Sequence, residues 1–271
     1  MLQLTESSLS QQQALAIKPD YLPGSCPYPC TDVRCKAYLN GYCGNDTIAI
    51  IKNTNNPYDN VGQQHNNGVR AIFPTIGSSN NIDSLVLTKV DSYVVTIGYS
   101  SDSMKSFYNR EVLAGYFPFS HVAELDSLGN KMQTNGLIST YANSYVQQIF
   151  TYSSNYFNSN TITNAMYSSY ASSLISLEST IKNDSRISSW EKQVLLSISA
   201  VGRYSASYWG NYFNSGSNND LIRPLLKIKL SNLWKVVISD IAGGLIGLSG
   251  GAVGIIGGAV GTSIVTAITL P

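Results

Sequence analysis

The C-terminal stretch constrains the fold of this chain most strongly, because no charged residue occurs from Ile241 to Pro271. Glycine recurs through this stretch at spacings of three, four and seven residues, between aliphatic residues. On an α-helix, glycines at such spacings line a groove without side chains, which lets helices in membranes pack closely. We therefore predict a glycine-zipper C-terminal helix, packing in or against a membrane through Gly243, Gly247, Gly250, Gly251, Gly254, Gly257, Gly258 and Gly261.

Free energy favours an apolar setting for this tail. Each glycine costs about 1 kcal/mol relative to alanine in a helix exposed to water. In a bilayer the backbone must satisfy its own hydrogen bonds, so the helix persists despite the glycines. About 20 apolar residues cross a membrane, which leaves room for a tilted span or for a re-entrant pair of helices turning near Ser249 to Gly251. A buried central helix of a soluble bundle and a contact between subunits are the alternatives.

Helical periodicity also dominates the rest of the chain. No alternation of apolar and polar residues is long enough to build a sheet. The predicted fold class is therefore all-α, an irregular multi-helix bundle with a disulfide- or metal-stapled N-terminal loop. The predicted domains are an N-terminal cysteine-containing segment (1–54), a helical domain (55–235) and the glycine-rich tail (236–271). Helices are predicted over Ile82 to Ile97, from Asn135 to Phe150, over Ile162 to Ile181, from Ser189 to Trp209, and from about Leu221 into the tail.

The first helix of the central domain has a recognisable start. Asn56 is a good N-cap, Pro57 suits the first helical position, and Asp59 favours the positive end of a helix. An apolar face follows at helical spacing, formed by Tyr58, Val61, His65, Val69 and Ile72. The short apolar run before it, Thr47 to Lys52, is read either as a strand or as the end of a helix.

The four cysteines lie in one loop rich in proline, glycine and tyrosine, at Cys26, Cys30, Cys35 and Cys43. Two disulfides would staple a loop that cannot bury a core of its own. A four-thiolate zinc site is the alternative, but the wide gap before Cys43 is poor zinc spacing. Free or mixed states of the thiols stay open, and the sequence does not choose among the three possible pairings.

Composition points to the secreted or envelope compartment. Charged residues make up 12% of the chain, about half the usual share. The net charge of +1 gives no reason to expect nucleic acid as a partner. Met1 to Gln13 lacks the pattern of a signal peptide, so either a leader precedes this numbering or export takes another route. The clustered cysteines favour the first interpretation.

We predict no enzymatic activity, cofactor or metal site. The chain has two histidines, His65 and His121. His65 lies on the apolar face, where a core histidine is expected, and Asp59 is poorly placed to share a metal with it. His121 stands near Glu124 and Asp126, an unspecific grouping. No nucleophile elbow, phosphate loop, dinucleotide fingerprint or HExxH motif is present.

The stretch Asn56 to Asn66 resembles a motif, NPYDxVGxxHN, of uncharacterised proteins from Bacteroidota-type bacteria. Its characteristic residues here are Pro57, Tyr58, Asp59, Gly62, His65 and Asn66. Trp190 to Leu196 and Val201 to Trp209 are similar to later landmarks of the same proteins, which also end in a hydrophobic tail rich in glycine and alanine. The resemblance implies no activity, and its one functional analogy is with the glycine-rich tails of bacteriocin-like peptides.

These observations predict a secreted or envelope-associated, non-catalytic protein that interacts with a membrane through its tail, bacteriocin-like or toxin-like. The expected partners are a membrane or an envelope protein, with self-association through the tail. The alternative function is a structural or interaction subunit of a cell-envelope assembly whose tail packs on a partner. An enzyme that uses His65 or His121 ranks last.

Overall fold

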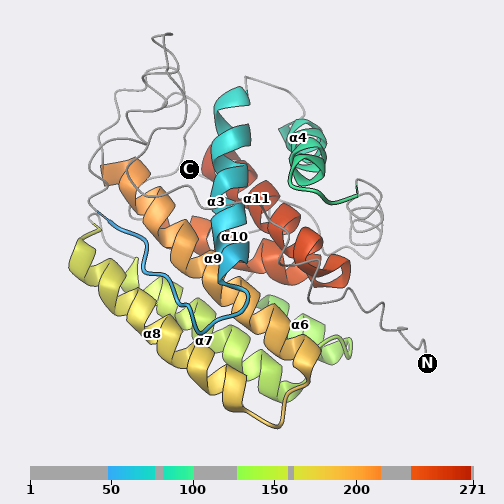
Figure 1. The fold of residues 1–271 in the computed structure, drawn as a ribbon, viewed down its shortest axis with the longest axis vertical. Helices are drawn as coiled ribbons and strands as arrows, with labels where there is room; N and C mark the ends of the chain where they lie inside the picture. The colour runs from blue at the N-terminus through green and yellow to red at the C-terminus, as the bar shows by residue number, and fades with distance from the viewer. Residues whose placement is uncertain (1–47, 77–81, 101–126, 158–161, 215–232, 270–271) are drawn as a thin grey trace.

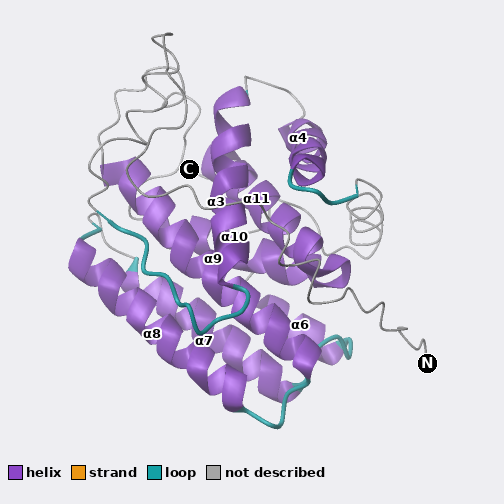
Figure 2. Cartoon of the chain, in the orientation of Figure 1, coloured by secondary structure: helices purple, strands orange, loops and turns teal. Residues whose placement is uncertain are grey.

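A computed structural model describes residues 48–76, 82–100, 127–157, 162–214 and 233–269 of the chain. Its regular structure is entirely helical, and no strand occurs in these residues, which confirms the all-α prediction (Figure 2). The cysteine loop and His121 lie outside the described residues. The α-helices are α3 (Asp59–Ile72), α4 (Ile82–Thr96), α6 (Leu128–Thr134), α7 (Thr140–Tyr156), α8 (Asn164–Asn183), α9 (Ser189–Asn214), α10 (Leu233–Ile246) and α11 (Gly251–Thr269); the 3-10 turns are η1 (Phe73–Thr75) and η5 (Gly247–Gly250).

The long helices α7, α8 and α9 pack against one another, each contacting the other two (Figure 1). Helix α3 packs on α9, and α10 and α11 form a helical hairpin that contacts α9 as well. α11 also packs against α3 and α4, while α10 packs against α7. We call α10, η5 and α11 the hairpin, and the other described residues the body.

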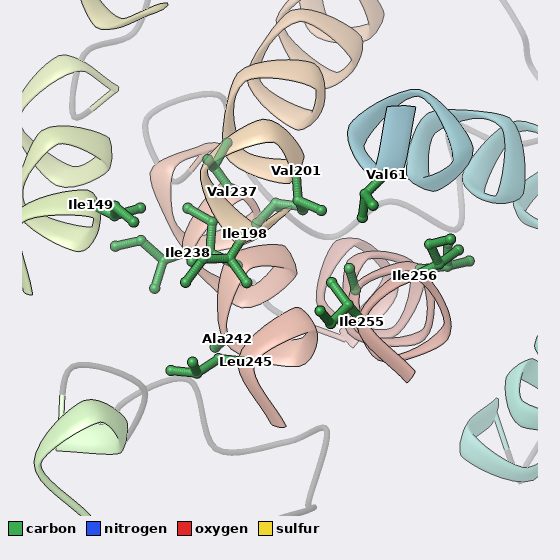
Figure 3. Close-up of a cluster of buried hydrophobic side chains, with 14 of the residues drawn as sticks. Val61, Ile149, Ile198, Val201, Val237, Ile238, Ala242, Leu245, Ile255 and Ile256 are labelled. Carbon is green, nitrogen blue, oxygen red and sulfur yellow. The ribbon is translucent and has the colours of Figure 1, made fainter. Parts of the chain in front are cut away.

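The core lies where the body meets the hairpin (Figure 3). Ile149 of α7 faces Ile238 of α10, and Ile198 of α9 lies between the body and the hairpin. All three side chains are buried. Burying aliphatic side chains of this size is worth about 1.5–3 kcal/mol each, so much of the stability of the body depends on the presence of the hairpin.

Local side-chain caps set where three body helices begin. The Ser139 hydroxyl accepts a hydrogen bond from the Ala142 amide at the start of α7. The predicted helix thus begins later than Asn135, and Leu137 stays 40% exposed before it. Thr163 caps α8 in the same way. α9 begins at Ser189, as predicted. The preceding Ser188 caps it: its hydroxyl accepts from the Glu191 amide while the Glu191 carboxylate accepts from the Ser188 amide, a reciprocal capping box.

The predicted helix start at Asn56 and Pro57 is corrected by two residues. α3 begins at Asp59, and the Asn56 side chain accepts a hydrogen bond from the Tyr58 amide in a turn that precedes the helix. The Asn56 amide group instead donates to the carbonyl of Leu196 on α9. The described part of the apolar run before it, Ile48 to Lys52, is neither strand nor helix.

The tail contains two helices rather than one. α10 ends at Ile246, and Gly251 has a φ of +64°, a conformation that residues with side chains rarely adopt. The chain reverses here, close to Ser249 to Gly251, where the re-entrant alternative places its turn. Of the residues from Gly251 to Ile268, 89% are buried inside the protein.

Candidate functional site

The motif segment is held against α9 by a buried ion network centred on Arg203. The Arg203 side chain is fully buried and donates to Glu178 on α8 and to Asp59 at the start of α3. A third hydrogen bond reaches the Ile51 carbonyl at 2.7 Å. Burial lowers the pKa of Arg203, but the charges of Glu178 and Asp59 outweigh it and raise this pKa overall. One cation thus joins α3, α8, α9 and the segment before α3.

Two hydroxyls and an amide complete this network. The Tyr204 hydroxyl donates to Asp59 at 2.8 Å, and the Asn53 side chain donates to Glu178 at 2.6 Å. The Tyr167 hydroxyl accepts from the Ile51 amide at 3.0 Å, and burial raises its pKa to about 12. Both carboxylates are therefore compensated by donors, as buried charges require.

Other motif residues also serve the contact between α3 and α9. A Cβ atom at Gly62 would collide with the carbonyl group of Ala200, so only glycine lets the two helices approach this closely. The Asn66 side chain donates to the Tyr204 carbonyl at 2.9 Å. Pro57 is exposed and Tyr58 is half-buried just before the helix. In this structure the described motif residues serve the packing of α3 on α9.

His65 extends from the motif to the hairpin. It is fully buried, and its Nδ1 atom lies 3.0 Å from Oδ1 of Asn66. Because the Asn66 amide nitrogen is used on Tyr204, its oxygen faces His65 and Nδ1 carries the proton, an assignment that rests on the hydrogen-bond pattern. The other ring nitrogen, Nε2, lies 3.3 Å from Oδ2 of Asp240 on α10. His65 and Asp240 thus form an ionisable contact between body and hairpin.

Asp240 collects hydrogen bonds from both sides of this boundary. Ser205 of α9 donates to its Oδ2 atom at 2.5 Å, and Ser263 of α11 donates to the same atom at 3.0 Å. Trp209 of α9 donates in turn to the Ser263 hydroxyl at 2.9 Å. Burial raises the pKa of Asp240, although His65 and the two serines partly offset this effect. We call Asp240, His65, Ser205, Ser263 and Trp209 the polar junction.

The polar junction lacks the geometry of a catalytic triad. A serine nucleophile needs a base that accepts its proton, but both serine hydroxyls donate to the carboxylate rather than to His65. Its histidine, aspartate and serines are also fully or almost fully buried, so the arrangement joins elements instead of receiving a substrate. Among the described residues, no group of three or more histidine, cysteine, aspartate or glutamate side chains could hold a metal ion.

Within the hairpin, glycine backbones touch across the two helices. A Cβ atom at Gly243 would collide with the carbonyl of Gly258, and one at Gly247 with the carbonyl of Gly254. The same face continues with Ser239 and Thr266, whose hydroxyls are hydrogen-bonded at 2.5 Å. Residues with small side chains thus recur at spacing four along both helices and meet in antiparallel order.

The other predicted packing glycines lie elsewhere. Gly257 and Gly261 are buried on α11, and Gly250 and Gly251 are half-buried at the turn. Gly244, which the prediction omits, faces side chains: a Cβ atom there would lie 3.3 Å from atoms of Ile198 and Ile255, a tight contact with groups that can shift.

Sequence reasoning missed the residues that join the elements, namely Arg203, Glu178 and Asp240. Each is a charged residue on the buried face of its helix, which signals a buried partner because such charges are rarely buried alone. Sequence alone did not say which partner each one finds, since the network joins residues as far apart as Ile51 and Arg203. Comparison with known proteins adds nothing to this site, because no family model, curated protein or solved structure matches the chain.

Proposed function

We propose that this chain is a non-catalytic, secreted or envelope-associated protein whose body carries the hairpin in soluble form and transfers it to a membrane. The observation that carries this proposal is the construction of the hairpin. Its two helices hold to each other through backbone contacts at glycines, while its outer faces are covered by body helices. Such a unit keeps its internal contacts when its surroundings change from protein to lipid.

The composition of the hairpin supports this proposal. Gly251–Ile268 in α11 is long and apolar enough to cross a membrane, although the core helix of a soluble protein passes the same test. Lys235 and Asp240 are the charged residues between Leu233 and Thr269. The glycine zipper of the sequence prediction would then act between α10 and α11, as small residues do between membrane helices.

The cover over the hairpin supports the transfer step. Most of it is apolar, with α3 and α4 over α11 and with α7 and α9 over α10. Contacts of this kind can be exchanged for lipid chains, which are as apolar as the core. The polar junction is the specific attachment, and it is made by few side chains. Stapling of the cysteine loop by disulfides remains a further expectation for the secreted form.

A second candidate is an interaction subunit of an envelope assembly. Leu137, Tyr141 and Trp190 are each at least 40% exposed, and they stand where α7 and α9 begin. These two helix starts are joined by the hydrogen bond from the Ser139 amide to Glu191. Contact surfaces are marked by contiguous apolar patches, and these three residues are the candidate patch of this second function. In this case the hairpin stays in the core and a partner binds at the helix starts.

Proteolysis of the full chain mixed with lipid vesicles distinguishes the two candidates. The vesicles are separated by flotation, treated with proteinase K, and the surviving peptides are identified by mass spectrometry. Transfer predicts a surviving fragment within 233–269 that disappears when detergent dissolves the vesicles. A chain that does not float, or that floats without such a fragment, contradicts the transfer. Protein incubated without vesicles is the control for protection by the body itself.

A further inference from the structure

The hairpin has one acidic residue, and that residue is fully buried at its boundary with the body. Asp240 is 0% exposed, and the sequence from Leu233 to Thr269 holds no other acidic group. Its Oδ2 atom receives hydrogen bonds from Ser205 and Ser263. Its Oδ1 atom receives none from the described residues, although it is buried. A carboxylate with one uncompensated oxygen in an apolar setting is costly, and a neutral carboxyl group costs less.

The hydrogen bonds around His65 also require a proton at this place. Nδ1 of His65 donates to Asn66, so in a neutral ring Nε2 has no proton of its own. Nε2 faces Oδ2 of Asp240 at 3.3 Å. Two acceptors at this distance repel each other unless one of them is protonated. The contact between body and hairpin is therefore a place where a proton is held.

We propose that Asp240 is a proton-binding switch: the hairpin leaves the body for lipid with the Asp240 carboxyl group protonated, so that proton binding controls the transfer. This inference rests on the proposed membrane function. The carboxylate takes one proton from the solution, and no other bond is made or broken. In the body, an ionised Asp240 accepts hydrogen bonds from Ser205 and Ser263, whereas in the lipid interior only Ser263 stays beside it.

Among the groups around Asp240, Asp240 itself is the one that both titrates in this pH range and moves with the hairpin. His65 faces it from α3, Ser205 and Trp209 belong to α9, and Ser263 belongs to α11. Tyr170 on α8 is a further titratable group near enough to interact with the Asp240 charge, but burial raises its own pKa far above neutral. Of these groups, only Asp240 and Ser263 move with the hairpin, and serine does not titrate in this range.

Linkage sets the size of the effect. Where Asp240 is ionised in the body and neutral in lipid, each transfer takes up one proton. The partition coefficient into vesicles then falls by up to about tenfold for each unit of rising pH. Asp240→Asn removes this dependence, because asparagine is neutral at every pH and keeps an oxygen that can accept from both serines.

The test compares flotation of full-length wild type and Asp240→Asn with neutral phosphatidylcholine vesicles from pH 5 to pH 9. The expected ratio of variant to wild-type partition is smallest at pH 5 and increases towards pH 9, by up to about tenfold per pH unit where Asp240 is ionised in the body. Glu191→Gln is the matched control, since it removes one body carboxylate outside the hairpin; its ratio to wild type should not follow this rise. A ratio for Asp240→Asn that is constant while both proteins float overturns the switch and leaves the membrane function standing.

Two other results of the flotation experiment also bear on the switch. If neither protein floats at any pH, the membrane function fails and the switch fails with it. If circular dichroism shows that Asp240→Asn does not fold, calorimetry of wild-type binding to vesicles in two buffers of different ionisation enthalpy replaces the comparison. Uptake of close to one proton at the upper end of the pH range supports the switch, and uptake of none overturns it.

Discussion

The body and the hairpin are held together by different kinds of contact. The body is held by contacts of charged side chains. These are the buried Arg203 network, the Glu191 carboxylate at the start of α9, and the ion pair between Asp184 and Arg186. Inside the hairpin, glycine backbones touch and the hydroxyls of Ser239 and Thr266 form a hydrogen bond. No salt bridge among the described residues lies within the hairpin.

This difference shows which region can tolerate a change of solvent. Charge networks depend on their surroundings, because an ion that loses its partner needs water. Close backbone contacts between helices hold in water-free protein and in lipid alike. The contacts inside the hairpin can therefore persist when it leaves the body, whereas the charge networks of the body depend on the surroundings that it has in the folded protein.

The largest expected effect is on the body. Arg203→Met leaves the buried Glu178 carboxylate and the partly buried Asp59 carboxylate without their cation, so we expect a loss of about 3–5 kcal/mol in the free energy of unfolding. Urea unfolding followed by circular dichroism measures it. Arg186→Met is the matched control, because Arg186 is 58% exposed in its pair with Asp184. A loss below about 1 kcal/mol for Arg203→Met would show that the network does not hold the body.

A smaller loss is expected in the hairpin for Gly247→Ala. The added methyl group meets the Gly254 carbonyl, which is backbone and cannot turn aside. Overpacking of this kind costs about 1–3 kcal/mol. Gly244→Ala is the control on the same helix, where the methyl group meets side chains of Ile198 and Ile255 at 3.3 Å. The melting temperature of Gly247→Ala should lie clearly below that of Gly244→Ala. Equal melting temperatures would show that the contact between Gly247 and Gly254 does not stabilise the hairpin.

The two regions should also respond to pH with opposite signs. Burial raises the pKa of Asp240, so its contribution to folding is complete in acid and is lost as pH rises through its folded pKa. Burial also raises the pKa of Glu191, but the hydrogen bonds from Ser188 and Ser139 lower it overall. Its contribution is therefore present near neutral pH and is lost as pH falls.

Urea unfolding of wild type against Asp240→Asn and against Glu191→Gln, repeated from pH 3 to pH 8, measures these signs. The stability difference for each pair should change with pH in opposite directions. One proton can change the difference by at most about 1.4 kcal/mol per pH unit. If both stability differences change with pH in the same direction, the pKa of one of the two carboxyl groups is shifted in the direction opposite to that expected.

The smallest effect is expected at the start of α9. Ser188→Ala removes the hydroxyl that accepts from the Glu191 amide, and loss of such a cap costs about 1 kcal/mol. Ser189→Ala, one residue further along, is the control, and it should change the unfolding free energy by less than half as much. If Ser189→Ala costs more than Ser188→Ala, the Ser188 hydroxyl does not cap this helix.

Helical spacing was enough to predict the all-α fold and most helices, because each body helix buries one continuous apolar face. The buried residues Val61, His65, Val69 and Ile72 lie on the face that the sequence predicts. Helix starts were less predictable: the α9 start at Ser189 was predicted, but α3 begins two residues after Pro57, because Asn56 forms a turn and donates to the Leu196 carbonyl instead of capping the helix.

The candidate site was only partly accessible from sequence. Composition drew attention to the tail and to His65, but the partner of His65 is Asp240, far along the chain. A periodic pattern reports which face of a helix is buried and not which helix covers it. The small residues at spacing four on α10 and α11 are visible in the sequence, yet their pairing depends on the turn at Gly251, whose conformation a list of glycines does not reveal.

The position of the hairpin after α9 has a consequence for how the protein is made. Chains are synthesised at about 5–20 residues per second, so α10 to α11 emerge over about 2–7 s after their binding faces on α3 and α9 already exist. During that interval Ile198 and Val61 have no hairpin to cover them. A newly made body thus exposes an apolar surface until α10 and α11 pack on it. A chaperone or the hairpin of another chain can bind that surface first.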